Sequence, residues 1–215
     1  MIITAGPQQD PREIRIQLPA QHRQIGVMLS GGADSAILLY LLALERKQTG
    51  SDHVLRPMCV PRTDGAWLYV QAIIDWVNQR LSTDIPSATQ VGDPTVHHSE
   101  QTNTGERDAR RQHGIEHIFY GSQRHPPVPM PGEYPGRPDR IEYTNNQGTV
   151  TTTCPFALVD KRHTMDLYGQ FDCWDLLAIT HSCTERTQGR CGKCYNCVER
   201  AWALSELNVP DSGVM

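Results

Sequence analysis

Residues 25–35 read Ile25-Gly26-Val27-Met28-Leu29-Ser30-Gly31-Gly32-Ala33-Asp34-Ser35. The run opens as a short apolar segment that fits a buried strand. It breaks at Ser-Gly-Gly and continues into an apolar stretch, residues 36–44, that is long enough for a helix. Glycine lets a ligand approach the main chain, and the first amides of a helix point outward without internal partners. The helix dipole adds positive charge at the same place. The stretch therefore predicts an anion site at a strand–turn–helix junction.

Three side chains in this turn bear on what it binds. Ser30 and Ser35 add hydroxyl donors. Asp34 is unusual, because a carboxylate repels a phosphate; it caps the helix, or it helps to hold a magnesium ion that bridges to the phosphate. A tight turn without a ligand is the competing interpretation. The residues that we expect at the nucleotide are Leu29, Ser30, Gly31, Gly32, Ala33, Asp34 and Ser35.

The string Ser-Gly-Gly-x-Asp-Ser directly after a buried strand resembles the pyrophosphate-binding loop of the PP-loop ATP pyrophosphatases. Enzymes of that group split ATP into AMP and pyrophosphate in order to activate an acceptor. The resemblance thus implies ATP as a ligand. The loop is not a Walker motif, because no Gly-Lys-Ser/Thr follows the glycines.

Length and composition narrow the class of protein. A chain of 215 residues fits one large domain, or one domain with a small appendage. A net charge of −4 gives no global reason to expect nucleic acid or an anionic membrane as partner. No apolar run reaches the roughly 20 residues of a membrane helix, and residues 1–15 lack the pattern of a signal peptide. We therefore expect a cytoplasmic protein without a membrane partner.

Strand and helix patterns alternate along the chain, which predicts the α/β class with a doubly wound parallel sheet. Strands are expected at about 25–29, 55–60, 87–91, 115–121 and 176–180, and helices at about 34–48, 66–81 and 160–170. Residues 12–18 fit a short edge strand, and Asn146-Gln147-Gly148 fits a hairpin turn.

Two segments are left open by the sequence. Residues 93–111 are polar; they are either solvated, or they bring Arg107, Arg110 or Arg111 over the phosphates. Residues 126–139 are dense in proline and glycine and form either a lid or a disordered loop. His97 and His98 are interpreted as ordinary surface residues.

The second strong pattern lies near the C-terminus, where Cys183 precedes Cys191, Cys194 and Cys197 at C-x2-C spacing. This spacing suits thiolates that converge on one ion, and four sulfurs without an open position fit a structural Zn²⁺ site. An iron–sulfur cluster would also suit four thiolates. We expect a nucleotide-binding domain at 1–180 and a zinc-binding helical module at 181–215 that packs on it. Four cations would offset the thiolate charge: Arg186, Arg190, Lys193 and Arg200.

The two patterns together resemble the 7-cyano-7-deazaguanine synthase family, which is QueC-like. The resemblance is carried by the N-terminal loop, by Thr180-His181-Ser182-Cys183, by residues 191–200 and by Pro155–Lys161. It implies an ATP-dependent ligase of queuosine biosynthesis that converts 7-carboxy-7-deazaguanine and ammonia into the nitrile, preQ0, through an acyl-adenylate and an amide. It implies ATP, Mg²⁺ and structural Zn²⁺, and leaves a homodimer open. The implied catalytic residues are Ser30, Asp34, Ser35 and Lys161.

The middle of the chain departs from that family. Val60-Pro61-Arg62-Thr63-Asp64 stands where the family usually has an Asp-Tyr-Gly-Gln-like turn. The acceptor is therefore left open: a different deazapurine, or a carboxylate on a protein or nucleic acid, in a divergent enzyme of a phage or defence island. A PP-loop enzyme of tRNA modification, or a non-catalytic module that binds a nucleotide, would also fit the glycine-rich turn.

Overall fold

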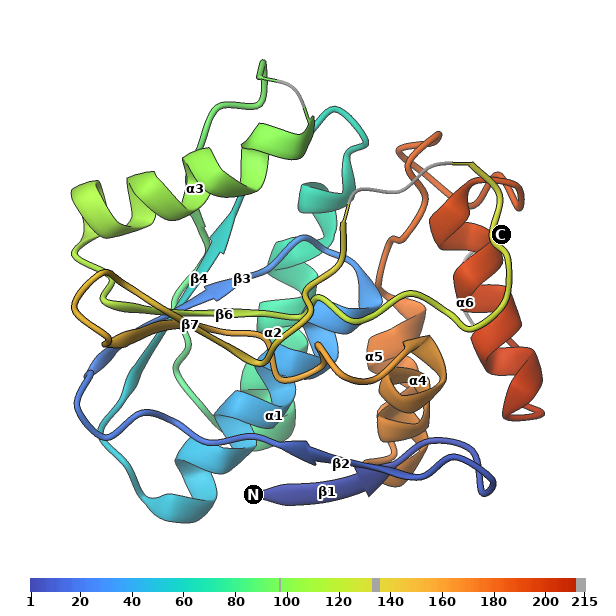
Figure 1. Cartoon of the computed structure of the whole chain (residues 1–215), viewed down its shortest axis with the longest axis horizontal. Helices are drawn as coiled ribbons and strands as arrows, with labels where there is room; N and C mark the ends of the chain where they lie inside the picture. The colour runs from blue at the N-terminus through green and yellow to red at the C-terminus, as the bar shows by residue number, and fades with distance from the viewer. Residues whose placement is uncertain (97, 133–135, 212–215) are drawn as a thin grey trace.

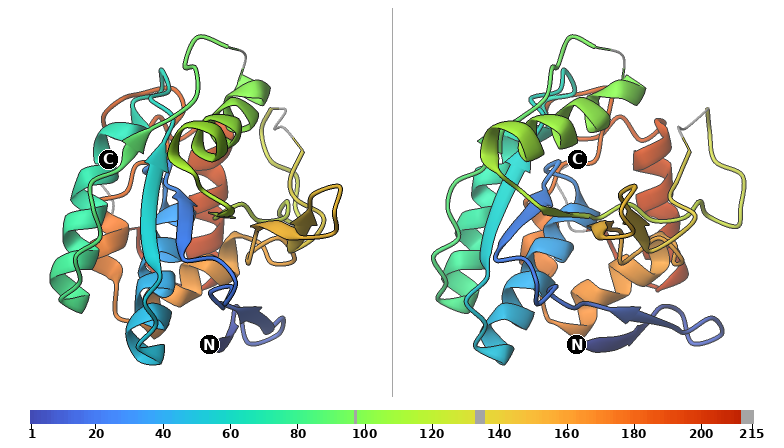
Figure 2. Two further views of the ribbon diagram at one scale, coloured as in Figure 1. Left: turned by 90° about the vertical axis from the view of Figure 1, so that its left-hand side faces the viewer. Right: turned by 60° about the vertical axis from the view of Figure 1, so that its left-hand side comes forward.

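The computed structural model describes residues 1–96, 98–132 and 136–211. Its main sheet has the strand order β5-β4-β3-β6-β8-β7. All neighbouring pairs are parallel except β7 and β8. Helices lie on both faces of this sheet (Figures 1 and 2). The strands are β3 Gln24–Met28, β4 Val54–Cys59, β5 Thr89–Gln90, β6 His117–Tyr120, β7 Glu142–Thr144 and β8 Val150–Thr153.

Alternating residues of the central strands pack into two separate cores. Ile25 and Val27 of β3 join the larger core, which contains helix α1, Ala33–Thr49, and helix α2, Val70–Leu81. Met58 of β4 and Ile118 of β6 belong to the smaller core, with Ala109 of helix α3, His98–His113. Because both faces are apolar and covered, the sheet is doubly wound, as the alternation of elements predicted.

Helix α1 is buried along most of its length, and its ends follow the sequence signals. It ends at Gly50, which adopts the left-handed conformation with φ of +62° and donates its amide to the last turn. The strand-turn-helix unit expected at 25–48 is thus confirmed. A 3-10 turn η1, Ala66–Tyr69, leads into α2, so the helix expected at 66–81 is also present.

The polar segment at 93–111 is ordered as most of α3, because part of it packs on the sheet. Thr104 and Ala109 are buried, and a Cβ at Gly105 would lie 3.1 Å from Val60. Arg110 donates to Glu106 and to the backbone oxygens of Glu116 and Thr151. This arginine therefore ties α3 to the sheet and does not reach over a phosphate site. Residue His97 and the side chain of His98 lie outside the described residues.

One expected strand is wrong. The segment at 176–180 is not a strand, because Trp174–Ala178 forms helix α5, in which Leu177 donates to the oxygen of Cys173. Leu176 and Leu177 are buried in the larger core, and a short apolar run can be buried there either as a helix or as a strand. The short strand expected at 12–18 is present as β2 Arg12–Arg15, which forms a separate antiparallel pair with β1 Ile2–Ala5.

Two helices of the C-terminal third bring the C-terminal segment against the body of the protein. Helix α4, Lys161–Gln170, follows a capping box in which Asp160 accepts the amide of Arg162 and pairs with His163. Helix α6, Tyr195–Glu206, packs against α4, and both lie on the same side of the molecule (Figure 1). Among the described residues, no helix combines the length and the apolar character that crossing a membrane requires.

Candidate functional site

The glycine-rich turn between β3 and α1 is held in one conformation by its own groups. Gly31 has φ of +88°, and a Cβ there would lie 1.9 Å from the backbone oxygen of Ala66. Only glycine fits this position. Gly32 is the N-cap residue of α1, and no side chain caps the helix. The Ser30 and Ser35 hydroxyls lie 3.1 Å apart, and the Ser35 hydroxyl donates to the oxygen of Gly32 at 3.0 Å.

Two cavities meet at this turn. The larger, of about 380 Å³, lies beyond the carboxyl ends of β3, β4 and β6, where parallel sheets bind ligands. The smaller, of about 110 Å³, lies between the turn and the cysteine-rich segment. Both cavities are lined by Ser30, Gly32, Asp34 and Arg62. The larger is also lined by Met28, Val60, Gln101, Tyr120, Ser122 and Arg137. The smaller is also lined by Asp64, Lys161, His181, Ser182, Thr184 and Asn196.

Asp34 does not cap α1, because Gly32 occupies the N-cap position. Its carboxylate forms an ion pair with Lys161 and accepts a hydrogen bond from the Thr164 hydroxyl at 2.8 Å. The fold therefore brings together two residues that are 127 positions apart in the chain. The lysine offsets the negative charge that would otherwise repel a phosphate at the turn.

The ion pair continues into a chain of alternating charges that reaches the proline-rich segment. The Lys161 ammonium lies 3.7 Å from one oxygen of Glu199, and Arg137 lies 2.9 Å from the other. Glu199 is 1% exposed and Lys161 is 5% exposed, so their charges are compensated inside the protein. The Arg137 guanidinium also lies over the ring of Tyr195, 5.4 Å from its centroid.

Sequence reasoning did not single out Glu199, although it lies two residues after the last cysteine of the cluster. A turn of α6 starting near Cys194 places Tyr195 and Glu199 on one face, because residues four apart are neighbours on a helix. Arg137 belongs to the 126–139 segment, whose role the sequence left open. Its partner comes from α6, and local sequence contains no signal for that contact.

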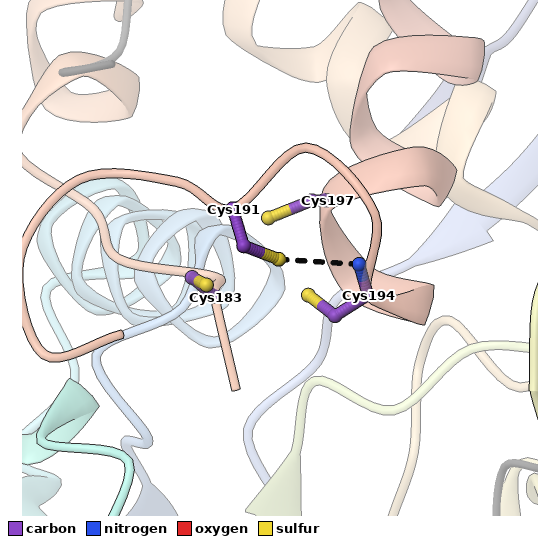
Figure 3. Close-up of side chains that lie close together, drawn as sticks. All are labelled: Cys183, Cys191, Cys194 and Cys197. Atoms are coloured by element: carbon purple, nitrogen blue, oxygen red, sulfur yellow. Dashed lines mark hydrogen bonds between the residues drawn. The ribbon is translucent and has the colours of Figure 1, made fainter. Parts of the chain in front are cut away.

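The four cysteines of the C-terminal pattern converge (Figure 3). Their sulfur atoms, from Cys183, Cys191, Cys194 and Cys197, all lie within 4.8 Å of one another. Zinc–sulfur bonds of about 2.3 Å in a tetrahedron place sulfurs roughly 3.8 Å apart. The cluster can thus hold a metal ion with little adjustment.

Backbone amides stabilise negative charge on these sulfurs. The Cys194 amide donates to the sulfur of Cys191 at 3.2 Å, and the Glu185 amide donates to that of Cys183 at 3.4 Å. Burial alone would raise the pKa of the Cys194 thiol, but hydrogen bonds from the backbones of Thr184 and Cys197 lower this pKa to about 6. Burial, together with the neighbouring Cys194 and Cys183, raises the pKa of Cys197 to about 12. Because a metal ion displaces the proton of a coordinating thiol, the four sulfurs still fit a metal centre.

Two arginines near the cysteine cluster have different roles. Arg190 interacts electrostatically with Cys183 and Cys197. Arg200 is fully buried, and it donates to Thr180 at 2.8 Å and to the oxygen of Leu177 at 3.2 Å. Burial lowers the pKa of Arg200 to about 10, which still leaves it charged at neutral pH. Through these hydrogen bonds Arg200 connects α6 to α5 and to the residues that follow α5.

The other three cysteines are buried thiols of low reactivity. Burial raises the pKa of Cys59, which lines the larger cavity. Burial also raises the pKa of Cys154 to about 12 and that of Cys173 to about 11. A thiol with a raised pKa is a poor nucleophile at neutral pH.

The profile of the family described as queuosine biosynthesis protein QueC matches residues 109–208. This region is similar to the QueC family. The QueC-like region contains Lys161, Glu199 and all four clustered cysteines, whereas the glycine-rich turn at 30–35 precedes it. No curated protein matches the chain. The structure joins the two parts, because Lys161 of the QueC-like region contacts Asp34 of the turn.

Proposed function

We propose that the protein is an ATP-dependent ligase that converts 7-carboxy-7-deazaguanine and ammonia into the nitrile 7-cyano-7-deazaguanine, with AMP and pyrophosphate as by-products. One contact supports this proposal more strongly than any other observation. A lysine of the QueC-like region pairs with the aspartate of a glycine-rich turn that has the features of a pyrophosphate site.

The proposed first step activates a carboxylate, which is a poor electrophile. A carboxylate oxygen attacks the α-phosphorus of ATP, the bond to the bridging oxygen breaks, and the electron pair leaves with pyrophosphate. The amides at the start of α1 would bind that leaving group, because they are fixed donors at a helix N-terminus. The hydroxyls of Ser30 and Ser35, which bond within the turn, would rotate to donate to it as well. Lys161 would offset charge on the phosphates from the wall of the smaller cavity.

The later steps follow from the chemistry of the acyl-adenylate. Ammonia attacks the acyl carbon, AMP leaves, and an amide forms with release of a proton. The amide oxygen then attacks a second ATP, pyrophosphate leaves again, and the amide nitrogen loses one of its two protons. Loss of AMP and of the second N–H proton gives the nitrile. Each nitrile therefore consumes one ammonia and two ATP molecules. The larger cavity, at the strand ends, is where we place the acceptor.

Two metal ions belong to this proposal. Cys183, Cys191, Cys194 and Cys197 would hold Zn²⁺, whose role is to fix the 181–215 module against the 1–180 domain. Mg²⁺ would arrive with the nucleotide and neutralise phosphate charge, and Asp34 is the described carboxylate that borders both cavities.

The test is product analysis with the purified protein, ATP, ammonia and 7-carboxy-7-deazaguanine. We expect AMP, pyrophosphate and the nitrile, identified by mass spectrometry. Ser35→Ala and Lys161→Met should each lower turnover by about 100-fold or more, while zinc content stays at the wild-type value. Formation of ADP in place of AMP would refute the adenylating mechanism. If AMP formed only with another acceptor, the proposed substrate would be wrong and the adenylating mechanism would stand.

A further inference from the structure

One cation outside the glycine-rich turn borders both cavities. Arg62 lies in the turn after β4, where it lines the larger and the smaller cavity. The other residues common to both linings are Ser30, Gly32 and Asp34, which belong to the glycine-rich turn. Within the described part of the chain, Arg62 is thus the shared cation at the junction of the two spaces.

The arginine is held by a short network in its own turn. Its guanidinium lies 2.9 Å from the Asp64 carboxylate, which also accepts the amide of Ala66 at 3.1 Å. The backbone closes the turn, because the Arg62 amide donates to Val60 and the Gly65 amide donates to Arg62. A guanidinium has five N–H donors in a rigid fork, and one carboxylate uses only part of that capacity.

The balance of charge distinguishes Arg62 from Lys161. The lysine ammonium lies between two carboxylates, those of Asp34 and Glu199. Arg62 pairs with Asp64, whose charge is shared with a backbone amide. Arg62 therefore keeps N–H donors that its own turn does not use, whereas the Lys161 ammonium is held by two carboxylates.

We propose that Arg62 binds ATP at the bond between its α- and β-phosphates and stabilises the charge that develops as this bond breaks. This inference rests on the proposed function. The smaller cavity, of about 110 Å³, is below the usual size for a nucleoside and accepts the pyrophosphate half, while the larger accepts the adenylate half. The bond that breaks then lies at their junction, where a guanidinium fork can contact oxygens on both sides.

A binding experiment tests this without knowledge of the acceptor. AMP and inorganic pyrophosphate are titrated separately into the full-length protein by calorimetry. Arg62→Ala should weaken both ligands by about 10-fold or more, because a charge-assisted hydrogen bond is lost in each case. Two variants serve as controls, since each residue lines one cavity only. Ser122→Ala should affect AMP alone, and Asn196→Ala should affect pyrophosphate alone.

Kinetics provide the second measurement. With an active acceptor, Arg62→Ala should lower kcat by about 100-fold and leave the KM of the acceptor unchanged, because the lost interaction forms in the transition state. Arg62→Lys should restore part of the rate, since it keeps the charge and loses the fork. Added guanidinium ion should also restore part of the Arg62→Ala rate, which a merely structural role would not allow.

The outcomes separate the two proposals. If the wild-type protein binds neither AMP nor pyrophosphate, the proposed function fails and this inference fails with it. If the wild-type protein binds both and Arg62→Ala changes one or neither, the inference alone is wrong. Should Arg62→Ala not fold, as judged by circular dichroism, Arg62→Gln replaces it, because it keeps a hydrogen bond to Asp64 and removes the charge.

Discussion

Glu199 on α6 and Arg137 in the 136–140 segment form a buried ion pair with 2.9 Å between Oε1 and Nη2. The two residues are 62 positions apart, and the second oxygen of Glu199 lies near Lys161. One carboxylate therefore connects the wall of the larger cavity to the lysine that pairs with the glycine-rich turn. The pair depends on α6, which begins directly after Cys194 of the four-cysteine cluster.

Replacing Glu199 by glutamine should destabilise the protein and loosen the 136–140 segment. The change keeps the shape but leaves Arg137 and Lys161 without their shared carboxylate, which should cost about 3–5 kcal/mol in the free energy of unfolding. Urea denaturation measures that loss, and the rate of tryptic cleavage after Arg140, in the same segment, should rise. Glu142→Gln, the same chemical change at an exposed strand position, should do neither. Equal stability of the two variants would contradict the role of this carboxylate.

Removing the metal should destabilise the whole chain. Cys191→Ser takes one ligand from a cluster that fixes the start of α6, so we expect a loss on the order of 5 kcal/mol, or roughly 10–20 °C in Tm. Zinc is measured by elemental analysis and Tm by calorimetry. Cys154→Ala changes a thiol outside the cluster and should keep one zinc per chain. A full zinc content in Cys191→Ser would show that the cluster is not the metal site.

Gly31→Ala should be far more harmful than glycine replacement elsewhere. The new Cβ would lie 1.9 Å from the oxygen of Ala66, at a φ of +88°, so we expect a cost of about 3–5 kcal/mol. Gly50→Ala is the matched control, since it has φ of +62° with nothing within 4 Å of the added Cβ. Gly50→Ala should therefore lower the free energy of unfolding by only about 1–2 kcal/mol, which is the cost of backbone strain at a positive φ. Similar urea midpoints for the two proteins would exclude the close approach.

Asp160 should make stability depend on pH in the acid range. Burial by itself would raise the pKa of this carboxyl, but hydrogen bonds from His163 and Arg162 outweigh burial and hold the pKa well below its usual value. A carboxyl with a lowered folded pKa contributes its stabilisation above the unfolded pKa of about 3.9, and the contribution is lost as pH falls towards the folded pKa.

The variant Asp160→Asn tests this directly. The difference in unfolding free energy between the wild-type protein and Asp160→Asn should be largest at pH 6 and should shrink between about pH 4 and pH 2. Asp52→Asn, at a side chain that is 79% exposed, should show little difference at any pH. A constant difference across this range would mean that Asp160 does not carry the expected charge in the folded protein.

Local patterns predicted several elements correctly because their causes are local. The turn at 30–35 follows from glycines that must adopt unusual angles or approach the backbone, and the helix after it ends where Gly50 permits. The hairpin around Gly148, now seen as β7 and β8, follows from its turn residues. The errors lie where local signals are ambiguous. Leu176 and Leu177 fit either a strand or a helix, and packing in the larger core chose the helix.

The polar stretch at 93–111 shows why composition alone misleads. Its residues offer little apolar surface, yet α3 is held because Arg110 bonds to Thr151 and Glu116, and Gly105 lets the helix approach Val60. Such partners come from distant strands, so no window of sequence contains them.

The sequence by itself determined a glycine-rich strand-to-helix turn, a cysteine cluster suited to metal, and an α/β sheet, because each depends on residues close together in the chain or on a repeating pattern. Only the tertiary structure decided that Lys161 faces Asp34, that Glu199 joins Lys161 to Arg137, and that Arg62 lies where two cavities meet. The physical reason is that these contacts join separate elements, and their charges are compensated only once the sheet and its helices have packed together.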